Sequence, residues 1–366
     1  MVQAEEAGTG VIRLARPDVG AEEAAEVAAV LESGQLTMGP KVAEFEAGLA
    51  RACAVEHALV VSSGTAALHL AVLTLGLGPG DEVLVPAYTF PATANVVAQV
   101  GARPVLVDVD PRTMNLDPER AHAAVTPRTR AVIAVHLFGR PLDWETLRAA
   151  VPEEVVLVED AAGALGARRG DRPCGGLGRL GCLSFHPRKI VTTGEGGAVT
   201  TSEPELAQRI RELRDHGIDR RGEFEIAGPG LNYRLSDILC AVGIPQLRRL
   251  EELLRERERV AAAYAARLDG LVELPGADEG DRHGRQAFIV QLDRRDDALE
   301  ALRQEGIEAQ IGTYALHRLA AYRDQGPFLG ADLSYERALA LPFHTSITEG
   351  DVERVASVLD KVVSHH

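Results

Sequence analysis

The sequence predicts an α/β fold with two domains: a large domain built on a mainly parallel mixed sheet, and a smaller C-terminal α+β domain. Three observations support this prediction. Strand-like and helix-like segments alternate between residues 57 and 159, as in a parallel sheet with right-handed crossovers. The strand-like segments are β-branched and nearly free of charge, as expected when helices cover both faces of a sheet. This rhythm changes after Gly270, and 366 residues are enough for two domains.

The elements follow from hydrophobic periodicity and from glycine and proline punctuation. In the first part of the chain we expect helices at 21–33, 41–53, 65–75, 93–99, 118–125, 142–150 and 203–216, and strands at 57–62, 82–86, 104–109, 131–136, 155–159 and 198–200. Residues 237–268 are expected to be helical with a break at Pro245. In the last part we expect strands at 287–292 and 307–311 and helices at 296–305 and 351–363.

The domain boundary is expected at the helical stretch. From residue 246 to residue 268, apolar residues such as Leu250 and Leu254 recur at helical spacing and the other face is rich in Arg and Glu. This pattern is typical of a helix that bridges two domains. We therefore predict a large domain over residues 1–245, with an N-terminal segment 1–40, and a small domain over residues 246–366 that includes the bridging helix 246–268.

Composition and charge exclude several classes of function. The net charge of −15 and the lack of long Lys/Arg runs argue against a nucleic-acid partner. No apolar run reaches membrane-spanning length, and no signal peptide is evident. The cysteines form no CxxC pair and have no histidine at metal-ligand spacing, so we expect no metal and reduced thiols in a cytoplasmic protein. They are Cys53, Cys174, Cys182 and Cys240.

One lysine, Lys189, lies between the segment Ser-Phe-His-Pro and a glycine-rich turn, residues 193–197. Glycines allow close approach of the backbone to a ligand. A lysine fixed beside such a turn can act as an amine nucleophile when its surroundings lower its pKa. Most lysines are solvated surface charges, so the interpretation depends on partners elsewhere in the chain.

Two strand ends offer such partners. Gly64 and Thr65 lie where a strand passes into a helix, and the free N–H groups there can bind phosphate, although a simple N-cap by Ser63 or Thr65 is equally compatible. Asp160 ends a predicted buried strand, at the edge where open α/β sheets bind ligands. A buried carboxylate needs a cationic partner: a protonated pyridine nitrogen would serve, and so would a structural Arg.

Two further groups complete the set. Tyr88 and Phe90 follow another strand, so their rings emerge at the same edge, where they can stack on a planar ligand or simply pack in the core. Asn232 and Arg234 lie in a Gly/Pro-containing loop before a helix, where they can contact a ligand, across a subunit boundary included, or only bond within the loop. A phosphate site, a stacking ring, a carboxylate for a ring nitrogen and an imine-forming lysine are together what pyridoxal 5'-phosphate (PLP) needs.

Five motifs in this order resemble the DegT-type sugar aminotransferases (the StrS family). The motifs are SSGTAALHLAV (62–72), GDEVLVPAYTFPAT (80–93), VEDAAGALGA (158–167), SFHPRKIVTTGEGGAVTT (184–201) and GLNYRLSD (230–237). The resemblance runs from about residue 34 to residue 344. It implies the fold of type I PLP enzymes, usually as a homodimer with active sites at the interface.

The resemblance also implies roles for individual residues. Lys189 would bind the cofactor covalently and Asp160 would pair with its ring nitrogen. Phe90 would stack on the ring, although Tyr88 is close enough in sequence to be confused with it. Residues implied to hold the phosphate are Gly64, Thr65 and Ser184, with Asn232 from the neighbouring subunit. Candidates for substrate contact are Tyr88, His186, Arg234, Tyr314 and His317, with Arg220, Arg221 and Arg318 in the same loops.

One position departs from the family pattern. After Asp160-Ala-Ala the family usually has Gln or His near the ring hydroxyl of the cofactor, and this chain has Gly163. The function implied is transamination from an amino acid, glutamate by analogy, to a keto-sugar linked to a nucleotide, in amino-sugar biosynthesis. Two alternatives stay open: a cyclitol or carbocyclic ketone as acceptor, and a PLP-binding sensor or accessory protein without turnover, which Gly163 keeps under consideration.

Overall fold

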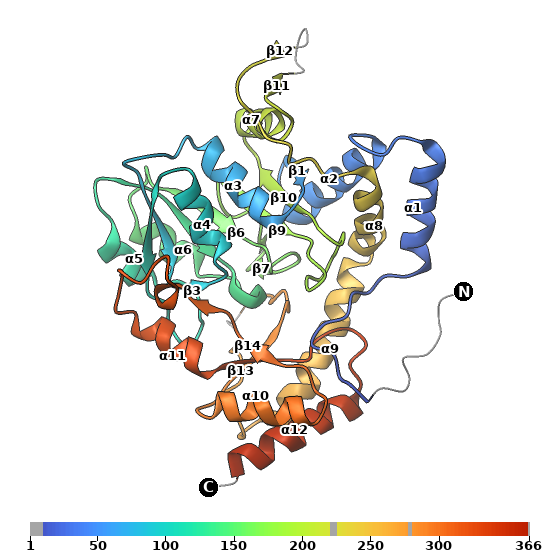
Figure 1. Cartoon of the computed structure of the whole chain (residues 1–366), viewed down its shortest axis with the longest axis vertical. Coiled ribbons are helices and arrows are strands. Elements are labelled where there is room, and N and C mark those ends of the chain that lie inside the picture. The colour runs from blue at the N-terminus through green and yellow to red at the C-terminus, as the bar shows by residue number, and fades with distance from the viewer. Residues whose placement is uncertain (1–9, 220–224, 277–279, 365–366) are drawn as a thin grey trace.

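A seven-stranded mixed sheet forms the centre of the larger part of the molecule (Figure 1). The computed structural model describes residues 10–219, 225–276 and 280–364. The strand order is β1-β10-β9-β6-β5-β2-β4. Strand β10 is antiparallel to both neighbours and all other pairs are parallel, which confirms the predicted mainly parallel mixed sheet. The strands are β1 (His57–Val61), β2 (Glu82–Pro86), β4 (Arg103–Val107), β5 (Thr129–Val135), β6 (Val156–Asp160), β9 (Leu180–Ser184) and β10 (Gly197–Thr201).

Helices cover both faces of this sheet. Side chains alternate along β1, so that Leu59 and Val61 belong to one apolar core while Ala58 and Val60 belong to the other. The first core includes residues of α3 (Gly64–Thr74), α4 (Ala92–Gln99) and α7 (Pro204–Arg214). The second includes residues of α2 (Pro40–Cys53), α5 (Pro118–Ala124), α6 (Trp144–Ala150) and α8 (Asp237–Arg248). Helix α1 (Ala21–Ser33) packs on α8.

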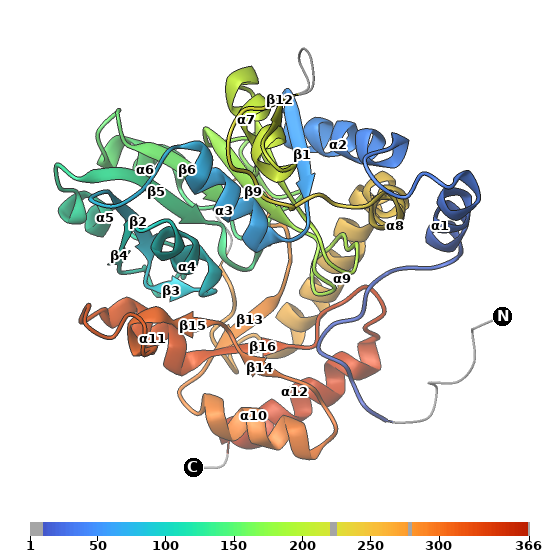
Figure 2. The same cartoon turned by 45° about the horizontal axis from the view of Figure 1, so that its top comes forward.

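Helix α9 (Leu250–Leu268) joins this part to a smaller one (Figure 2). Its first turns contribute Leu250 and Leu254 to the second core, whereas Val260 and Tyr264 belong to a third core around a three-stranded antiparallel sheet. The elements of the small part are β13 (Phe288–Gln291), α10 (Arg295–Gln304), β14 (Gln310–Ile311), α11 (Leu329–Arg337), β16 (Ala338–Leu341) and α12 (Glu349–Ser364). The bridging pattern of the sequence thus matches the contacts of α9, while the domain boundary at residue 245 stays a prediction.

The N-terminal segment reaches the small part. Ile12 pairs with Ile307, and the N–H of Phe343 donates to the carbonyl of Leu14 at 2.9 Å. The sequence predicts this segment as part of the large domain. Its contacts with the small part are single residue pairs, which leave no periodic pattern in the sequence.

Several elements differ from the sequence prediction. Strands β9 and β16 were not expected: β9 carries two small residues and ends in a serine, and β16 is an alanine–leucine segment of only four residues. Pro245 does not break the helix. It lies inside α8, and the break follows at Arg249, where the chain passes into α9.

Several ladders are only two residues long. They comprise β3 (Tyr88–Thr89) with β15 (Tyr314–Ala315), β7 (Arg168–Arg169) with β8 (Arg172–Pro173), and β11 (Ile218–Asp219) with β12 (Glu225–Ile226). Along the part of the chain that the structure describes, no helix is both long and apolar enough to cross a membrane.

A buried carboxylate fixes the start of β2. Glu82 is almost fully buried and accepts hydrogen bonds from Thr126 Oγ1 at 2.6 Å and from Arg128 Nη2 at 2.7 Å. Burial alone would raise the pKa of Glu82, but these two partners, with Arg103 nearby, hold it below the ordinary value. The carboxylate therefore stays ionised and ties β2 to the segment that precedes β5.

Candidate active site

Lys189 lies in the connection between the antiparallel strands β9 and β10. The connection is closed by backbone hydrogen bonds: Phe185 N–H donates to the carbonyl of Gly196 at 2.8 Å, and Thr193 N–H to the carbonyl of Phe185 at 3.0 Å. Lys189 N–H donates to the carbonyl of His186 at 2.8 Å, which forms a tight turn before the lysine. The backbone of Lys189 is therefore held by an ordered turn rather than a free loop.

Gln246 of α8 holds this connection through two hydrogen bonds of its side chain. Its side chain is 1% exposed. Thr192 N–H donates to Gln246 Oε1 at 3.0 Å, and Gln246 Nε2 donates to the carbonyl of Thr192 at 2.8 Å. Sequence reasoning missed this residue; the available signal was a polar residue within the otherwise apolar segment 238–247.

Asp160 ends β6 and is 6% exposed. Its Oδ2 accepts a hydrogen bond from Thr93 Oγ1 at 2.9 Å, and its Oδ1 accepts one from Ala162 N–H at 3.2 Å. Burial raises the pKa of Asp160, while these two donors and the charge of Lys189 oppose the rise. Thr93, at the start of α4, is a second residue that sequence reasoning missed, because its contact joins positions 67 residues apart.

The Lys189 amine is set up as a nucleophile. Burial lowers its pKa below the ordinary value; the negative charge of Asp160 opposes this, and the positive charges of Arg188 and Arg257 lower the pKa further. In the part of the chain that the structure describes, no group is hydrogen-bonded to Lys189 Nζ. A larger neutral fraction of an amine without a competing partner favours attack on a carbonyl carbon.

The expected phosphate site lies at the same sheet edge. Ser63 caps α3 by accepting the N–H of Ala66 at 3.0 Å, which leaves the N–H groups of Gly64 and Thr65 at the helix start. A Cβ on Gly64 would lie 2.8 Å from the Cβ of Ser184, so only glycine permits this approach. The structure therefore brings Gly64, Thr65 and Ser184 together, as the phosphate hypothesis needs.

The two candidate rings after β2 have different environments. Phe90 is 60% exposed and lies edge-on to Tyr314, with ring centroids 6.2 Å apart. Tyr88 is fully buried, and its hydroxyl accepts the N–H of Thr313 at 3.1 Å. Phe90 and Tyr314 can thus face a ligand together. Tyr88 has no surface to offer one, because its side chain is packed in the first apolar core.

The remaining candidates are dispersed. His186 is exposed beside the lysine turn, and its Nδ1 accepts the N–H of Arg188 at 3.2 Å. Asn232 is exposed, and Arg234 forms an ion pair with Asp215. His317 Nε2 lies 3.0 Å from Asp332 Oδ1 of α11, a contact that ties its ring to that helix. Arg318 is also paired with Asp332, and Arg220 and Arg221 lie outside the described residues.

A buried network lies directly behind Asp160. Glu159 accepts three backbone N–H groups at 2.6–2.7 Å, from Gly175, Leu177 and Gly178, and it also contacts His136 Nε2 at 2.9 Å. Within the described ranges, His136, Glu159 and Cys174 form the single cluster whose ligand atoms are close enough for a metal ion. The hydrogen bonds to Glu159 account for its burial without a metal.

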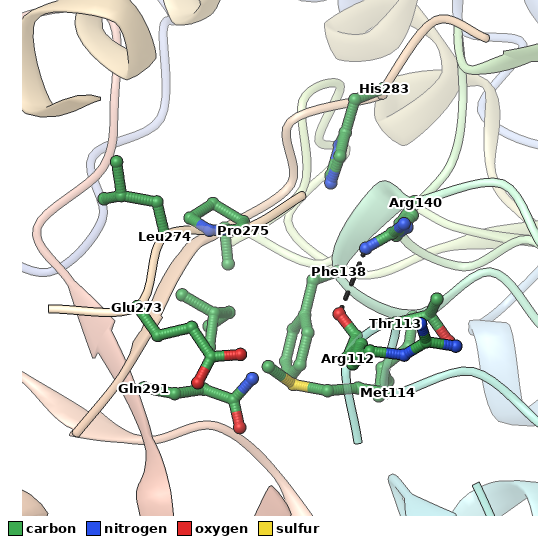
Figure 3. Close-up of a pocket in the computed structure, with 13 residues that line it drawn as sticks. Arg112, Thr113, Met114, Phe138, Arg140, Glu273, Leu274, Pro275, His283 and Gln291 are labelled. Atoms are coloured by element: carbon green, nitrogen blue, oxygen red, sulfur yellow. Dashed lines mark hydrogen bonds between the residues drawn. The ribbon is translucent and has the colours of Figure 1, made fainter. Parts of the chain in front are cut away.

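A pocket between the two parts of the molecule lies away from these groups (Figure 3). It is lined by Arg112 and Met114 on one side and by Glu273 and Gln291 on the other, with His283 above Arg140. Its volume of about 20 Å³ holds roughly one water molecule. It is too small for a substrate and includes none of the candidate residues.

A family model described as the DegT/DnrJ/EryC1/StrS aminotransferase family matches residues 17–360. The chain belongs to this family. A curated relative, the GDP-perosamine synthase of Caulobacter vibrioides, is 40% identical in an alignment 341 residues long that covers 89% of this chain and 91% of that protein. This DegT/StrS aminotransferase is thus matched to its family over nearly its whole length.

Solved structures of other aminotransferases match the fold. The PLP form of the putative sugar aminotransferase Spr1654 from Streptococcus pneumoniae superposes with a TM-score of 0.92 at 29% identity, covering 97% of this chain and 99% of that one. The aminotransferase TlmJ from Streptoalloteichus hindustanus gives 0.92 at 35% identity, covering 96% and 99%. These matches confirm the predicted fold class, the aminotransferase activity and PLP as the cofactor.

The residues of this aminotransferase fit PLP. The Lys189 amine is available, Asp160 keeps acceptor capacity beyond its two hydrogen bonds, and the start of α3 is open for a phosphate. The carboxyl ends of β1, β2, β6 and β9 present all these groups at one edge of the sheet, the place where such sheets bind ligands.

Proposed function

We propose that this enzyme transfers an amino group from an amino acid, glutamate, to the keto carbon of a nucleotide-linked sugar in amino-sugar biosynthesis. The observation that supports it most strongly is geometric: Lys189 follows β9 in a closed turn and Asp160 ends β6, the strand paired with β9. Burial lowers the pKa of the Lys189 amine, which favours its role as a nucleophile. The amine can bind the aldehyde carbon of PLP, and the carboxylate can pair with the nitrogen at the other end of the ring.

Each residue has a defined task in this proposal. PLP, when bound, supplies an electron sink. Asp160 holds the proton on the ring nitrogen, and Phe90 packs on the ring face. Gly64, Thr65 and Ser184 hold the phosphate. Lys189 would hold the cofactor through Nζ, and the amine, once freed by the amino donor, would carry the proton from the donor Cα to the cofactor.

The acceptor is inferred from the relatives and from the ring pair at the site. The curated relative is named for a GDP-linked sugar, which favours a nucleotide-linked acceptor, with a GDP sugar as the first to test. Tyr314 is proposed to contact it, because its exposed ring lies beside Phe90. His186 and Arg234 are proposed as further contacts; His317 is bound to Asp332 and would have to turn to take part.

We also propose that the protein is a homodimer with shared active sites and that it is located in the cytoplasm. Asn232 is exposed in the single chain, so its side chain is available to reach the phosphate site of a neighbouring subunit. The four cysteines are buried free thiols, which suits a reducing compartment.

The experiment is a panel of keto-sugar nucleotides and keto-cyclitols incubated with glutamate and read by mass spectrometry. We expect an amino sugar to form in step with 2-oxoglutarate from one nucleotide-linked substrate. Turnover of the cyclitols alone would change the acceptor class. A visible spectrum that does not respond to glutamate, with no product from any acceptor, would refute the proposal and favour a binding protein without turnover.

A further inference from the structure

Gln286 occupies the space beside Gly163. A Cβ built on Gly163 would lie 3.3 Å from Gln286 Cγ and 3.5 Å from Gln286 Oε1. Gly163 follows Asp160 by three residues, and its backbone is not in the left-handed region that would require glycine. The missing side chain at position 163 therefore makes room for the side chain of Gln286, which comes from the small part of the molecule.

The backbone of Gln286 is fixed at this position. Gln286 N–H donates to the carbonyl of Phe138 in the short helix η1 (Leu137–Gly139) at 3.2 Å, and the carbonyl of Gln286 accepts Arg257 Nη1 at 3.1 Å. Gly284 N–H donates to the carbonyl of Gly139 at 2.8 Å. These bonds dock residues 284–286 against the large part, so the side chain starts from a defined point.

The amide of Gln286 is free to bind a ligand. The side chain is half-buried, and among residues 10–219, 225–276 and 280–364 no group is hydrogen-bonded to it. A glutamine amide offers two donors and one acceptor. A half-buried amide that lies against a glycine and has no bond of its own can serve a bound molecule at little structural cost.

Arg257 contacts the backbone of Gln286 and acts electrostatically on the reactive amine of Lys189. The guanidinium that bonds to the Gln286 carbonyl is almost fully buried. Its positive charge also helps to lower the pKa of Lys189, after burial and the charge of Arg188. Gly163 is joined to Asp160 through two alanines, so the contact between Gln286 and Gly163 lies three residues along the chain from the buried carboxylate.

We propose that Gln286 is a cofactor-binding residue, donated by the small part of the molecule in place of a side chain at position 163. PLP carries its phosphate arm and its ring oxygen on opposite edges of the ring. The phosphate site, Gly64 with Ser184, is built from different residues than the contact between Gly163 and Gln286. We assign the amide of Gln286 to the ring oxygen because its contact with Gly163 is separate from the phosphate site and lies three residues along the chain from Asp160, the proposed partner of the ring nitrogen. This inference rests on the proposed function.

The test compares cofactor affinity of apo protein variants by titration of visible absorbance. Gln286→Met keeps the size and packing of the side chain and removes the amide, so we expect PLP to bind about tenfold more weakly with unchanged unfolding temperature, as for one lost hydrogen bond. Moving the amide by the double variant Gly163→Gln with Gln286→Ala should restore most of the affinity. The pH midpoint of the visible spectrum should shift in Gln286→Met, which a packing role would not cause.

The outcomes separate this inference from the proposed function. Equal PLP affinity and an equal spectral pH midpoint in Gln286→Met and the wild type would overturn the role of Gln286 while leaving the aminotransferase intact. Failure of the double variant to bind better than Gln286→Met would also overturn it. Failure of the wild type to bind PLP would instead reject the proposed function.

Discussion

Thr93 provides a sharp test of how Asp160 is held. The Thr93 hydroxyl is fully buried and makes the shorter of the two hydrogen bonds to the carboxylate, 2.9 Å against 3.2 Å from Ala162 N–H. Thr93→Val keeps the shape of the side chain and removes that donor. A hydrogen bond to a charged group contributes about 1.5–3 kcal/mol, so we expect PLP affinity to fall by about 10- to 100-fold.

The direction follows from the pKa of Asp160. Burial already raises it, and the loss of the hydroxyl raises it further, which weakens the ionised form that pairs with a ring cation. The assay is the dissociation constant of PLP for the apo protein, with Thr93→Ser as the matched control that keeps the hydroxyl. Wild-type affinity in Thr93→Val, or equal losses in Thr93→Ser and Thr93→Val, would refute the reasoning.

Three further predictions concern charge, stability and assembly. Burial and then the charge of Arg188 lower the pKa of Lys189, so Arg188→Gln should raise that pKa and move the pH midpoint of the rate of PLP capture upward; an unchanged midpoint would count against it. The lowered pKa of Glu82 means that its carboxylate stabilises the fold fully above the ordinary Glu pKa and loses this contribution as the pH falls through the lowered value. Glu82→Gln should therefore reduce the free energy of unfolding by about 1–3 kcal/mol at neutral pH, and the difference should shrink in acid denaturation series; a constant difference would contradict the sign. Mixing subunits that carry Lys189→Ala with subunits that carry Asn232→Asp should restore activity through hybrid dimers, whereas a mixture as inactive as its components would oppose shared sites.

The sequence predicts the architecture well where the signal is local and periodic. Helix α1 was expected at residues 21–33 and strand β2 at 82–86, and the structure has the same bounds. The long helical stretch was also expected, but its break was placed at Pro245. Helix α8 tolerates Pro245 in its interior, and the helical stretch is interrupted only at Arg249.

The sequence predicts the residues proposed to contact the cofactor, but not the residues that hold them in position. Lys189, Asp160 and Gly64 stand in recognisable motifs at strand ends, and strand ends of one sheet meet at one edge. Thr93 and Gln246 act through contacts with residues 67 and 54 positions away, which no local pattern records. The contact of Gln286 with Gly163 joins two positions far apart in the sequence, so only the structure indicates a role for Gln286.

The central claim is that Lys189 is the residue that binds PLP. The chain has only three lysines, so covalent trapping has few possible outcomes. Lys41 is paired with Glu26 at 2.6 Å, and Lys361 lies on the C-terminal helix α12. Reduction of the PLP-loaded protein with borohydride, followed by peptide mass spectrometry, should place the cofactor on the peptide that contains Lys189, and Lys189→Ala should give no adduct. An adduct on either other lysine, or none in the wild type, would contradict the account.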